Sequence, residues 1–136
     1  MSNRWLLKTE PGEYSFEDLL REGRTAWDGV TNALALRHLR AVRPGDALLI
    51  YHTGTVRVVV GEARAVSHPY PDPAKADPRF VVVDLVPVRQ LPAPVPLARI
   101  KADPRFREFE LVRLPRLSVM PVPAPLWRAL LEMASA

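Results

Sequence analysis

The sequence contains no cysteine among its 136 residues. This absence excludes disulfide bridges, thiolate zinc sites and thiol nucleophiles together. The three histidines, His38, His52 and His68, are widely spaced and include no His-x-x-x-His pair. We therefore expect no metal site in this protein.

Glycine is also scarce, with six residues, and the signatures of common enzymes are missing. The chain has no Gly-x-Ser-x-Gly turn of a hydrolase, no phosphate-binding glycine loop and no dinucleotide-binding glycine cluster. These absences predict a protein that is not an enzyme, has no catalytic residues and uses no cofactor.

Long hydrophobic runs are missing as well. Apolar stretches such as residues 58–60 and 80–83 have the length of strands, whereas a helix that spans a bilayer needs about 18 or more apolar residues. The first residues also lack the apolar segment and cleavage site of a secretory leader. We expect a cytoplasmic protein with no membrane partner.

Among what the sequence does contain, proline stands out, with fifteen residues that lie mostly between positions 69 and 125. This spacing excludes long helices in that region and favours short extended segments. A chain of 136 residues with 48% hydrophobic residues has the size and composition of one globular domain. We therefore expect a single domain over residues 1–136.

Local patterns predict strands together with short helices. Strands are expected at residues 5–9, 47–51, 55–65, 80–88, 109–114 and 116–120. Short helices are expected after the caps Ser15 and Asn32, near residues 96–100 and at residues 126–133. This order predicts an α+β fold in which a small mixed β-barrel is flanked by short helices.

Arginine supplies sixteen of the nineteen basic residues, and the net charge is +4. Residues 89–128 alone hold eight basic and three acidic residues. Because arginine makes forked contacts with phosphate, this segment is a candidate for holding a nucleic-acid backbone. The alternative is a basic surface that only keeps the protein soluble.

Polar and aromatic residues are concentrated at predicted strand ends and loops, where rigid elements can direct them into one concavity. Trp27 lies in a loop before a helix cap, and Tyr51 lies at a strand end. We expect these two rings to be opposite walls of a slot for a planar base. Asn32 either reads the edge of that base or only caps its helix.

The remaining candidates have simpler alternatives. His52 is either a ligand contact or a hydrogen-bonded structural group. Lys8 and Arg116 are candidates for contacts with phosphate or carbonyl groups, or else form surface ion pairs with Glu10 or Asp28. The same strand ends and loops also hold the candidate binding residues Thr9, Tyr14, Ser15 and Ser118.

Several short motifs follow one another from residue 5 to residue 122. They are Trp-Leu-Leu-Lys-Thr-Glu-Pro at 5–11, Tyr-Ser at 14–15, Trp-Asp-Gly-Val-x-Asn at 27–32, Gly-Asp at 45–46, Tyr-His at 51–52, Val-Gly-Glu-Ala at 60–63, Tyr-Pro-Asp-Pro at 70–73 and Arg-Leu-Ser-Val-Met-Pro-Val at 116–122. Each motif alone is weak evidence, but together and in this order they resemble the EVE domain family.

The resemblance implies a PUA-like fold and kinship with thymocyte nuclear protein and with the YTH and ASCH domains. It also implies that the partner is DNA or RNA with a modified base, for example a methylated or hydroxymethylated one, held flipped out in an aromatic pocket. By motif, the pocket walls are Trp27 and Tyr51, the edge readers are Asn32 and Ser15, and the rim or backbone contacts are Lys8, Arg116 and Ser118. We expect a monomeric chain.

Two other functions remain open at this point. One is an enzyme that acts on a nucleobase or small metabolite in the same slot, with Glu10, Asp28 or His52 as the acid or base. The other is a module that binds RNA or a protein through its basic face and has no base pocket. The residues expected to carry that second function are Arg105, Arg107 and Arg113.

Overall fold

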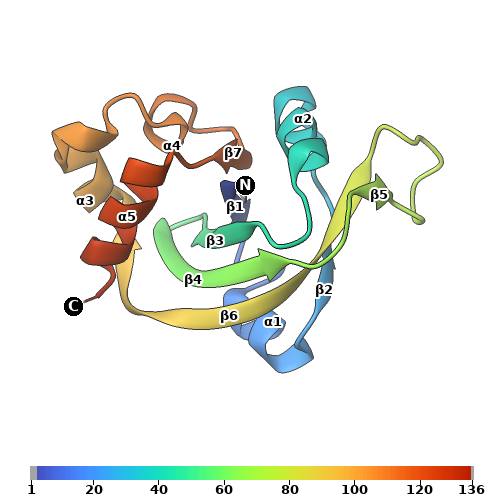
Figure 1. The fold of residues 1–136 in the computed structure, drawn as a ribbon, viewed down its shortest axis with the longest axis horizontal. Helices are drawn as coiled ribbons and strands as arrows, with labels where there is room; N and C mark the ends of the chain where they lie inside the picture. The colour runs from blue at the N-terminus through green and yellow to red at the C-terminus, as the bar shows by residue number, and fades with distance from the viewer. Residues whose placement is uncertain (1–2, 136) are drawn as a thin grey trace.

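In the computed structural model, which describes residues 3–135, a curved seven-stranded sheet forms the body of the protein (Figure 1). The strands are β1 (Arg4–Thr9), β2 (Thr25–Trp27), β3 (Ala47–His52), β4 (Val58–Ala65), β5 (Tyr70–Pro71), β6 (Val81–Pro96) and β7 (Val119–Pro121). Their order in the sheet is β2-β6-β4-β3-β1-β7, and β5 pairs with β6. Only β1 and β3 run parallel among the described pairs.

Short helices flank this sheet. They are α1 (Phe16–Glu22), α2 (Ala33–Ala41), α3 (Leu97–Ala102), α4 (Glu110–Arg113) and α5 (Ala124–Met133), with a 3-10 turn, η1 (Pro104–Phe106). In Figure 1, α3, α4 and α5 lie together at one end of the sheet, and α2 lies at the other end. The predicted α+β class, with a small curled sheet flanked by short helices, is confirmed.

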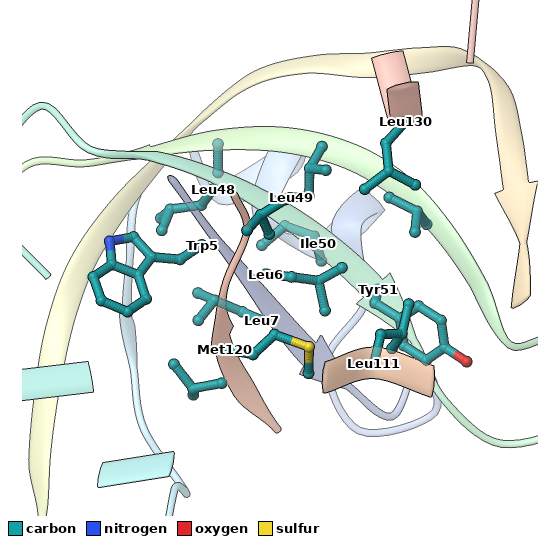
Figure 2. Close-up of a cluster of buried hydrophobic side chains, with 14 of the residues drawn as sticks. Trp5, Leu6, Leu7, Leu48, Leu49, Ile50, Tyr51, Leu111, Met120 and Leu130 are labelled. Carbon is teal, nitrogen blue, oxygen red and sulfur yellow. The ribbon is translucent and has the colours of Figure 1, made fainter. Parts of the chain in front are cut away.

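The central strands β1 and β3 are covered on both faces. Consecutive residues of each strand are buried, among them Leu6, Leu7 and Leu49. Figure 2 shows that Leu111 of α4 and Leu130 of α5 belong to the same hydrophobic cluster. Each fully buried leucine contributes roughly 1.5–3 kcal/mol of transfer free energy. Because leucines of the sheet and of the helices belong to one cluster, one core stabilises both.

Helix α1 begins where the sequence predicts. The side chain of Ser15 accepts a hydrogen bond from the Asp18 N–H, and the Asp18 carboxylate accepts one from the Ser15 N–H. The Phe16 N–H donates to Nε2 of His52 at 3.0 Å, which links the start of α1 to the end of β3. Gly23, with φ of 76°, ends the helix in the left-handed conformation that glycine adopts without strain.

The buried carboxylate of Asp46 joins residues 3–5 to the turn before β3. It accepts hydrogen bonds from the indole Nε1 of Trp5 at 2.9 Å, from the Arg43 N–H at 2.9 Å and from the Asn3 N–H at 3.0 Å. Because a buried carboxylate needs such donors to offset its desolvation, Asp46 fixes the turn that places β3 beside β1.

Several elements differ from the sequence predictions, among them the strand expected at residues 116–120, which is β7 and begins at Val119. Residues 109–114 were expected to be a strand but form helix α4; a short apolar run does not distinguish the two structures by periodicity. The strand expected from residue 55 begins at Val58, because residues 54–57 turn through Gly54 and Arg57, both with positive φ.

Strand β6 is longer than predicted and continues through four prolines to Pro96. Its pairing with β2 ends at Leu85, and its later residues pair only with β4. Proline is tolerated there because an N–H directed to an unpaired edge is not needed by the sheet.

No helix within residues 3–135 has the length and apolar character needed to cross a bilayer. Over the same residues, no three histidine or acidic side chains are grouped as they would be around a metal ion.

Candidate functional site

A cavity of about 460 Å³ opens at the end of β1. It is bounded by the turn after β1, by the end of α1 and the whole of β2, and by the residue before β7. The lining residues are Lys8, Thr9, Glu10, Glu13, Tyr14, Glu22, Thr25, Ala26, Trp27, Asp28, Gly29, Val30 and Ser118. This volume lies in the range of about 300–1,000 Å³ that small-molecule sites occupy.

Two aromatic rings form one corner of the cavity. Trp27 is the last residue of β2 and pairs with Val83 of β6, and its side chain is 6% exposed. The rings of Trp27 and Tyr14 meet edge to face, with centroids 6.2 Å apart and planes at 85°. Because the two rings contact each other, they leave no slot between them for a planar ring.

Hydrogen bonds hold Tyr14 in this corner. Its hydroxyl donates to Oε1 of Glu22 at 2.6 Å, and its carbonyl oxygen accepts from the Thr9 hydroxyl at 2.7 Å. Burial, together with the Glu22 carboxylate, raises the pKa of Tyr14 above its ordinary value. The phenol therefore stays neutral at physiological pH and keeps a fixed orientation.

Within residues 3–135, Lys8 is the one basic residue that lines the cavity. Its Nζ donates to the Pro115 carbonyl oxygen at 2.9 Å and lies 5.5 Å from the centre of the Tyr51 ring. Burial lowers the pKa of Lys8 below its ordinary value. Within residues 3–135 no carboxylate lies within ion-pair distance of this ammonium group, so it can donate to a ligand without breaking an ion pair.

Among the described residues, four acidic residues line the cavity together with Lys8: Glu10, Glu13, Glu22 and Asp28. The Glu22 carboxylate is bonded to Tyr14, and that of Glu10 accepts from the Gly12 N–H. The side chains of Glu13 and Asp28 have no hydrogen-bond partner in the described part of the chain. The lining is therefore acidic, which disfavours phosphate and favours a ligand that donates hydrogen bonds.

The structure brings together five of the residues predicted from the sequence, namely Lys8, Thr9, Tyr14, Trp27 and Ser118. Four of them lie at or beside a strand end, and Tyr14 lies in the turn before α1. Their predicted role in binding stays a prediction.

The expected slot between Trp27 and Tyr51 is wrong in its geometry. Tyr51 is 3% exposed and does not line the cavity; Figure 2 places it in the hydrophobic cluster with Leu111. The reason is the parallel pairing of β1 and β3, which sets Lys8 directly beside Tyr51 so that the lysine side chain covers the ring. Tyr14 takes the place that was expected for Tyr51.

Three other predicted residues lie outside the lining, and the side chain of each accepts a hydrogen bond from a backbone N–H at the start of a helix. Ser15 and His52 bond the first turn of α1, and the Asn32 side chain accepts from the Ala35 N–H at 3.0 Å at the start of α2. Burial lowers the pKa of His52, which keeps its acceptor nitrogen neutral. The structural alternatives considered for Asn32 and His52 are therefore present in the fold.

Three of the eight basic residues of segment 89–128 form ion pairs. Arg89 pairs with Glu62, Arg105 with Asp103, and Arg113 with Glu108. Arg116 is exposed and lies outside the lining of the cavity. Among the described residues, no basic side chain of this segment lines the cavity, so its role in phosphate binding stays a prediction.

Sequence reasoning missed part of the lining. Strand β2 has three residues, too few for a periodic pattern, so Thr25 and Ala26 gave no signal. Glu13 and Glu22 are brought to the cavity by the turn before α1 and by the helix itself. Only the observed length of α1 shows that Glu22, at the end of this helix, lines the same cavity as Glu13 and Tyr14.

Comparison with known proteins places the chain in context. A family model for the EVE domain matches residues 3–133. Human thymocyte nuclear protein 1 is 30% identical over 128 residues, which cover 75% of this chain and 57% of that protein. The mouse protein of the same name is 28% identical over 90% of this chain and 69% of its own length. The chain thus spans little more than half of the human relative.

Solved structures agree with this assignment. An NMR structure of Rpa0253 from Rhodopseudomonas palustris has 38% identity and a TM-score of 0.91, with 97% of this chain and 92% of that chain covered. A crystal structure of human THYN1 protein in complex with 5-methylcytosine-containing DNA has 27% identity and a TM-score of 0.90, with 99% of both chains covered. An ASCH protein from Zymomonas mobilis, at 11% identity and a TM-score of 0.62, shares the fold. The chain belongs to the EVE domain family.

Proposed function

We propose that this protein binds nucleic acid that carries a modified base, with 5-methylcytosine in DNA as the first ligand to test. The base lies flipped out of the stack, in the cavity beside Trp27 and Tyr14. One observation carries the proposal: this cavity, with an aromatic corner, lies in a chain that is 27% identical, over 99% of its length, to a protein solved with 5-methylcytosine-containing DNA.

The lining has suitable partners for the edge of a cytosine. The exocyclic amine of cytosine donates hydrogen bonds, and carboxylates accept them; Asp28 and Glu13 have side chains available for this contact. The ring nitrogen and the carbonyl of cytosine are acceptors, and the Ser118 hydroxyl and the Lys8 ammonium are donors. An acidic cavity is thus compatible with a neutral, amine-bearing base although it disfavours phosphate.

The energies are sufficient for base flipping. Extruding a base costs a few kcal/mol, whereas contact with an aromatic side chain contributes roughly 1–3 kcal/mol and each edge hydrogen bond about 1 kcal/mol. A methyl group that packs against an apolar side chain such as Val30 adds about 0.8 kcal/mol. We therefore expect methylated cytosine to bind about fourfold more tightly than cytosine.

The protein acts in this proposal as a reader and not as an enzyme. In this proposal the ammonium of Lys8 and the hydroxyl of Tyr14, which are held by the Pro115 carbonyl and the Glu22 carboxylate, orient the bound base. Mass spectrometry of nucleosides incubated with the protein tests this point. A new product would support the enzyme alternative.

The direct test is a titration of labelled DNA duplexes that differ only in one methyl group. We expect Trp27→Ala to weaken binding of the methylated duplex by about 5- to 150-fold, from the removal of roughly 1–3 kcal/mol of stacking energy, and Trp27→Phe to weaken it less. Trp127→Phe is the matched control, because Trp127 is buried in α5 and does not line the cavity. Equal binding by wild type and Trp27→Ala would contradict the proposal.

A further inference from the structure

A second hollow lies near the cavity at the end of β1, which we call the base cavity because the proposed function places a base in it. The second hollow measures about 300 Å³ and is lined by Thr31, Ala33, Leu36, Arg40, Arg79 and Phe80. A neighbouring hollow of about 370 Å³ shares Arg40 and is lined also by Arg43, His68, Pro69, Tyr70, Pro71 and Val81. We call these two hollows together the Arg40 groove. It runs from the start of α2 to the segment between β5 and β6.

The charge of the Arg40 groove is opposite to that of the base cavity. Three arginines and one histidine line it, and no acidic residue among those that the structure describes does. The guanidinium of Arg40 donates to the Arg79 carbonyl oxygen at 2.6 Å, and that of Arg43 donates to the carbonyl oxygens of Arg40 and Val42 at 2.7 and 2.8 Å. Carbonyl oxygens fix these groups in place without neutralising them.

Of the groove arginines, only Arg79 has an ion-pair partner within residues 3–135, namely Asp77 at 2.7 Å. Arg40 and Arg43 therefore keep two uncompensated positive charges at the surface. Exposed arginines that are held in place by carbonyl oxygens are suited to the forked recognition of phosphate.

The Arg40 groove also has an aromatic ring. Phe80 is half-buried, and the Arg79 guanidinium and the Lys75 ammonium lie 5.8 and 5.9 Å from its centre. An aromatic face bordered by cations is the combination that binds a base together with its phosphate.

The two sites are adjacent along one loop. Asp28, Gly29 and Val30 line the base cavity, whereas Thr31 and Ala33 line the Arg40 groove. From Val30 to Ala33 the chain spans at most about 11 Å, and a stacked DNA strand carries one phosphate per about 3.4 Å of helix axis. Phosphates a few nucleotides from a base in the cavity can therefore reach the groove.

We propose that the Arg40 groove binds the phosphates and a flanking base of the strand whose modified base occupies the cavity. The strand crosses residues 28–32 and continues toward α2, away from the four carboxylates at the cavity. This inference rests on the proposed function and extends it, because it assigns the backbone contact to α2 and the segment between β5 and β6 in place of residues 89–128.

The test compares Arg40→Gln/Arg43→Gln with wild type in titrations of the 5-methylcytosine duplex at several salt concentrations. We expect weaker binding. The logarithm of the association constant should also fall less steeply with the logarithm of salt concentration, by about 0.9 for each phosphate that is no longer neutralised. The ratio of affinities for methylated and unmethylated DNA should stay unchanged. Arg37→Gln is the matched control, because Arg37 is exposed on the same helix but lies outside the groove.

Second variants keep the test valid if the double variant is unstable. Arg40→Lys retains the charge, so its salt slope should match that of wild type. Phe80→Leu retains the apolar packing but removes the aromatic face, so its affinity should fall severalfold at every salt concentration.

Three results would overturn the inference. If Arg40→Gln/Arg43→Gln has the affinity and salt slope of Arg37→Gln, the groove does not hold phosphate. This result overturns the inference alone when Trp27→Ala loses binding, because the proposed function then stands. If a glutamate-rich peptide binds through Arg40 while DNA binding does not depend on Arg40, the groove serves a protein. If the wild type does not bind DNA at all, the proposed function falls, and this inference falls with it.

Discussion

At the scale of single residues, the contact between Gly61 of β4 and Phe16 of α1 shows how closely the helix approaches the sheet. A Cβ atom at Gly61 would lie 2.4 Å from Cζ of Phe16, whose side chain is 1% exposed. The pairing of β4 with β6 also shifts register between Val59 and Gly61. The absence of a side chain at Gly61 thus lets α1 pack where the sheet bends.

This contact predicts that Gly61→Ala lowers the free energy of unfolding by about 1–3 kcal/mol, since a buried ring must move or the strand must shift. The same substitution should cost less in a Phe16→Leu background, because the overlapping ring atoms are gone. Urea denaturation of the two single variants and the double variant measures this coupling. Identical costs in both backgrounds would show that the ring is not the cause.

The ring of His52 predicts a dependence of stability on pH. Its Nε2 accepts the Phe16 N–H, and burial lowers its pKa below the ordinary value of about 6.5. Below about pH 6.5 the unfolded chain takes up a proton that the folded chain resists. The contribution of His52 is therefore complete above about pH 6.5 and is lost as the pH falls through the folded-state pKa.

His52→Gln tests this effect, because a glutamine oxygen can accept the same N–H but does not titrate. Thermal unfolding between pH 7.5 and pH 5 should show a smaller loss of stability for His52→Gln than for wild type. Parallel curves for the two proteins would mean that another group causes the pH dependence.

At the scale of elements, Asn32 at the start of α2 has two alternative roles, as a helix cap and as a reader of the base edge. Its side-chain oxygen caps the helix through the Ala35 N–H, and the residue lies outside both the base cavity and the Arg40 groove. We expect Asn32→Ala to lower the free energy of unfolding by about 1 kcal/mol, and Asn32→Ser to retain most of it, because serine also caps helices.

The binding measurement then distinguishes the cap from an edge reader. If Asn32 is only a cap, Asn32→Ser should bind methylated DNA as wild type does. A stable Asn32→Ser protein without any preference for the methyl group would show instead that the amide reads the base.

Elements with strong local signals were predictable from the sequence. Helices α1 and α2 carry their caps in the chain, and β1 and β3 are apolar runs ended by turn residues, so each appears near its expected position. Strand β2 and helix α4 were not predictable, because each is at most four residues long and is held in place by the rest of the fold. These short elements matter for function, since β2 positions Trp27.

At the scale of the whole molecule, the site depends on contacts that no local pattern contains. Trp27, Tyr14 and Lys8 line one cavity, as their expected positions at strand ends and loops indicate. The sequence does not indicate that β1 and β3 pair in parallel, or that this pairing buries Tyr51 beneath Lys8. The partner of Trp27 was therefore predicted to be the wrong tyrosine.

The distribution of charge also becomes visible only in the folded molecule. Composition places the basic excess in residues 89–128, where three of the eight basic residues form ion pairs. Arg40 of α2 and Arg43 just after it have no ion-pair partner within residues 3–135, and they line a groove beside residues 28–32, which border an acidic cavity. This arrangement separates a place for a base from a place for phosphate.

The central claim is that a flipped base lies against Trp27, and the emission of tryptophan tests it most directly. Trp5 and Trp127 are buried outside the cavity, so a base in the cavity should quench Trp27 alone. We predict that saturating methylated DNA quenches the wild type, whereas Trp27→Phe binds the same DNA with little change in emission. Equal quenching of both proteins, or saturated binding without quenching of the wild type, would contradict the claim.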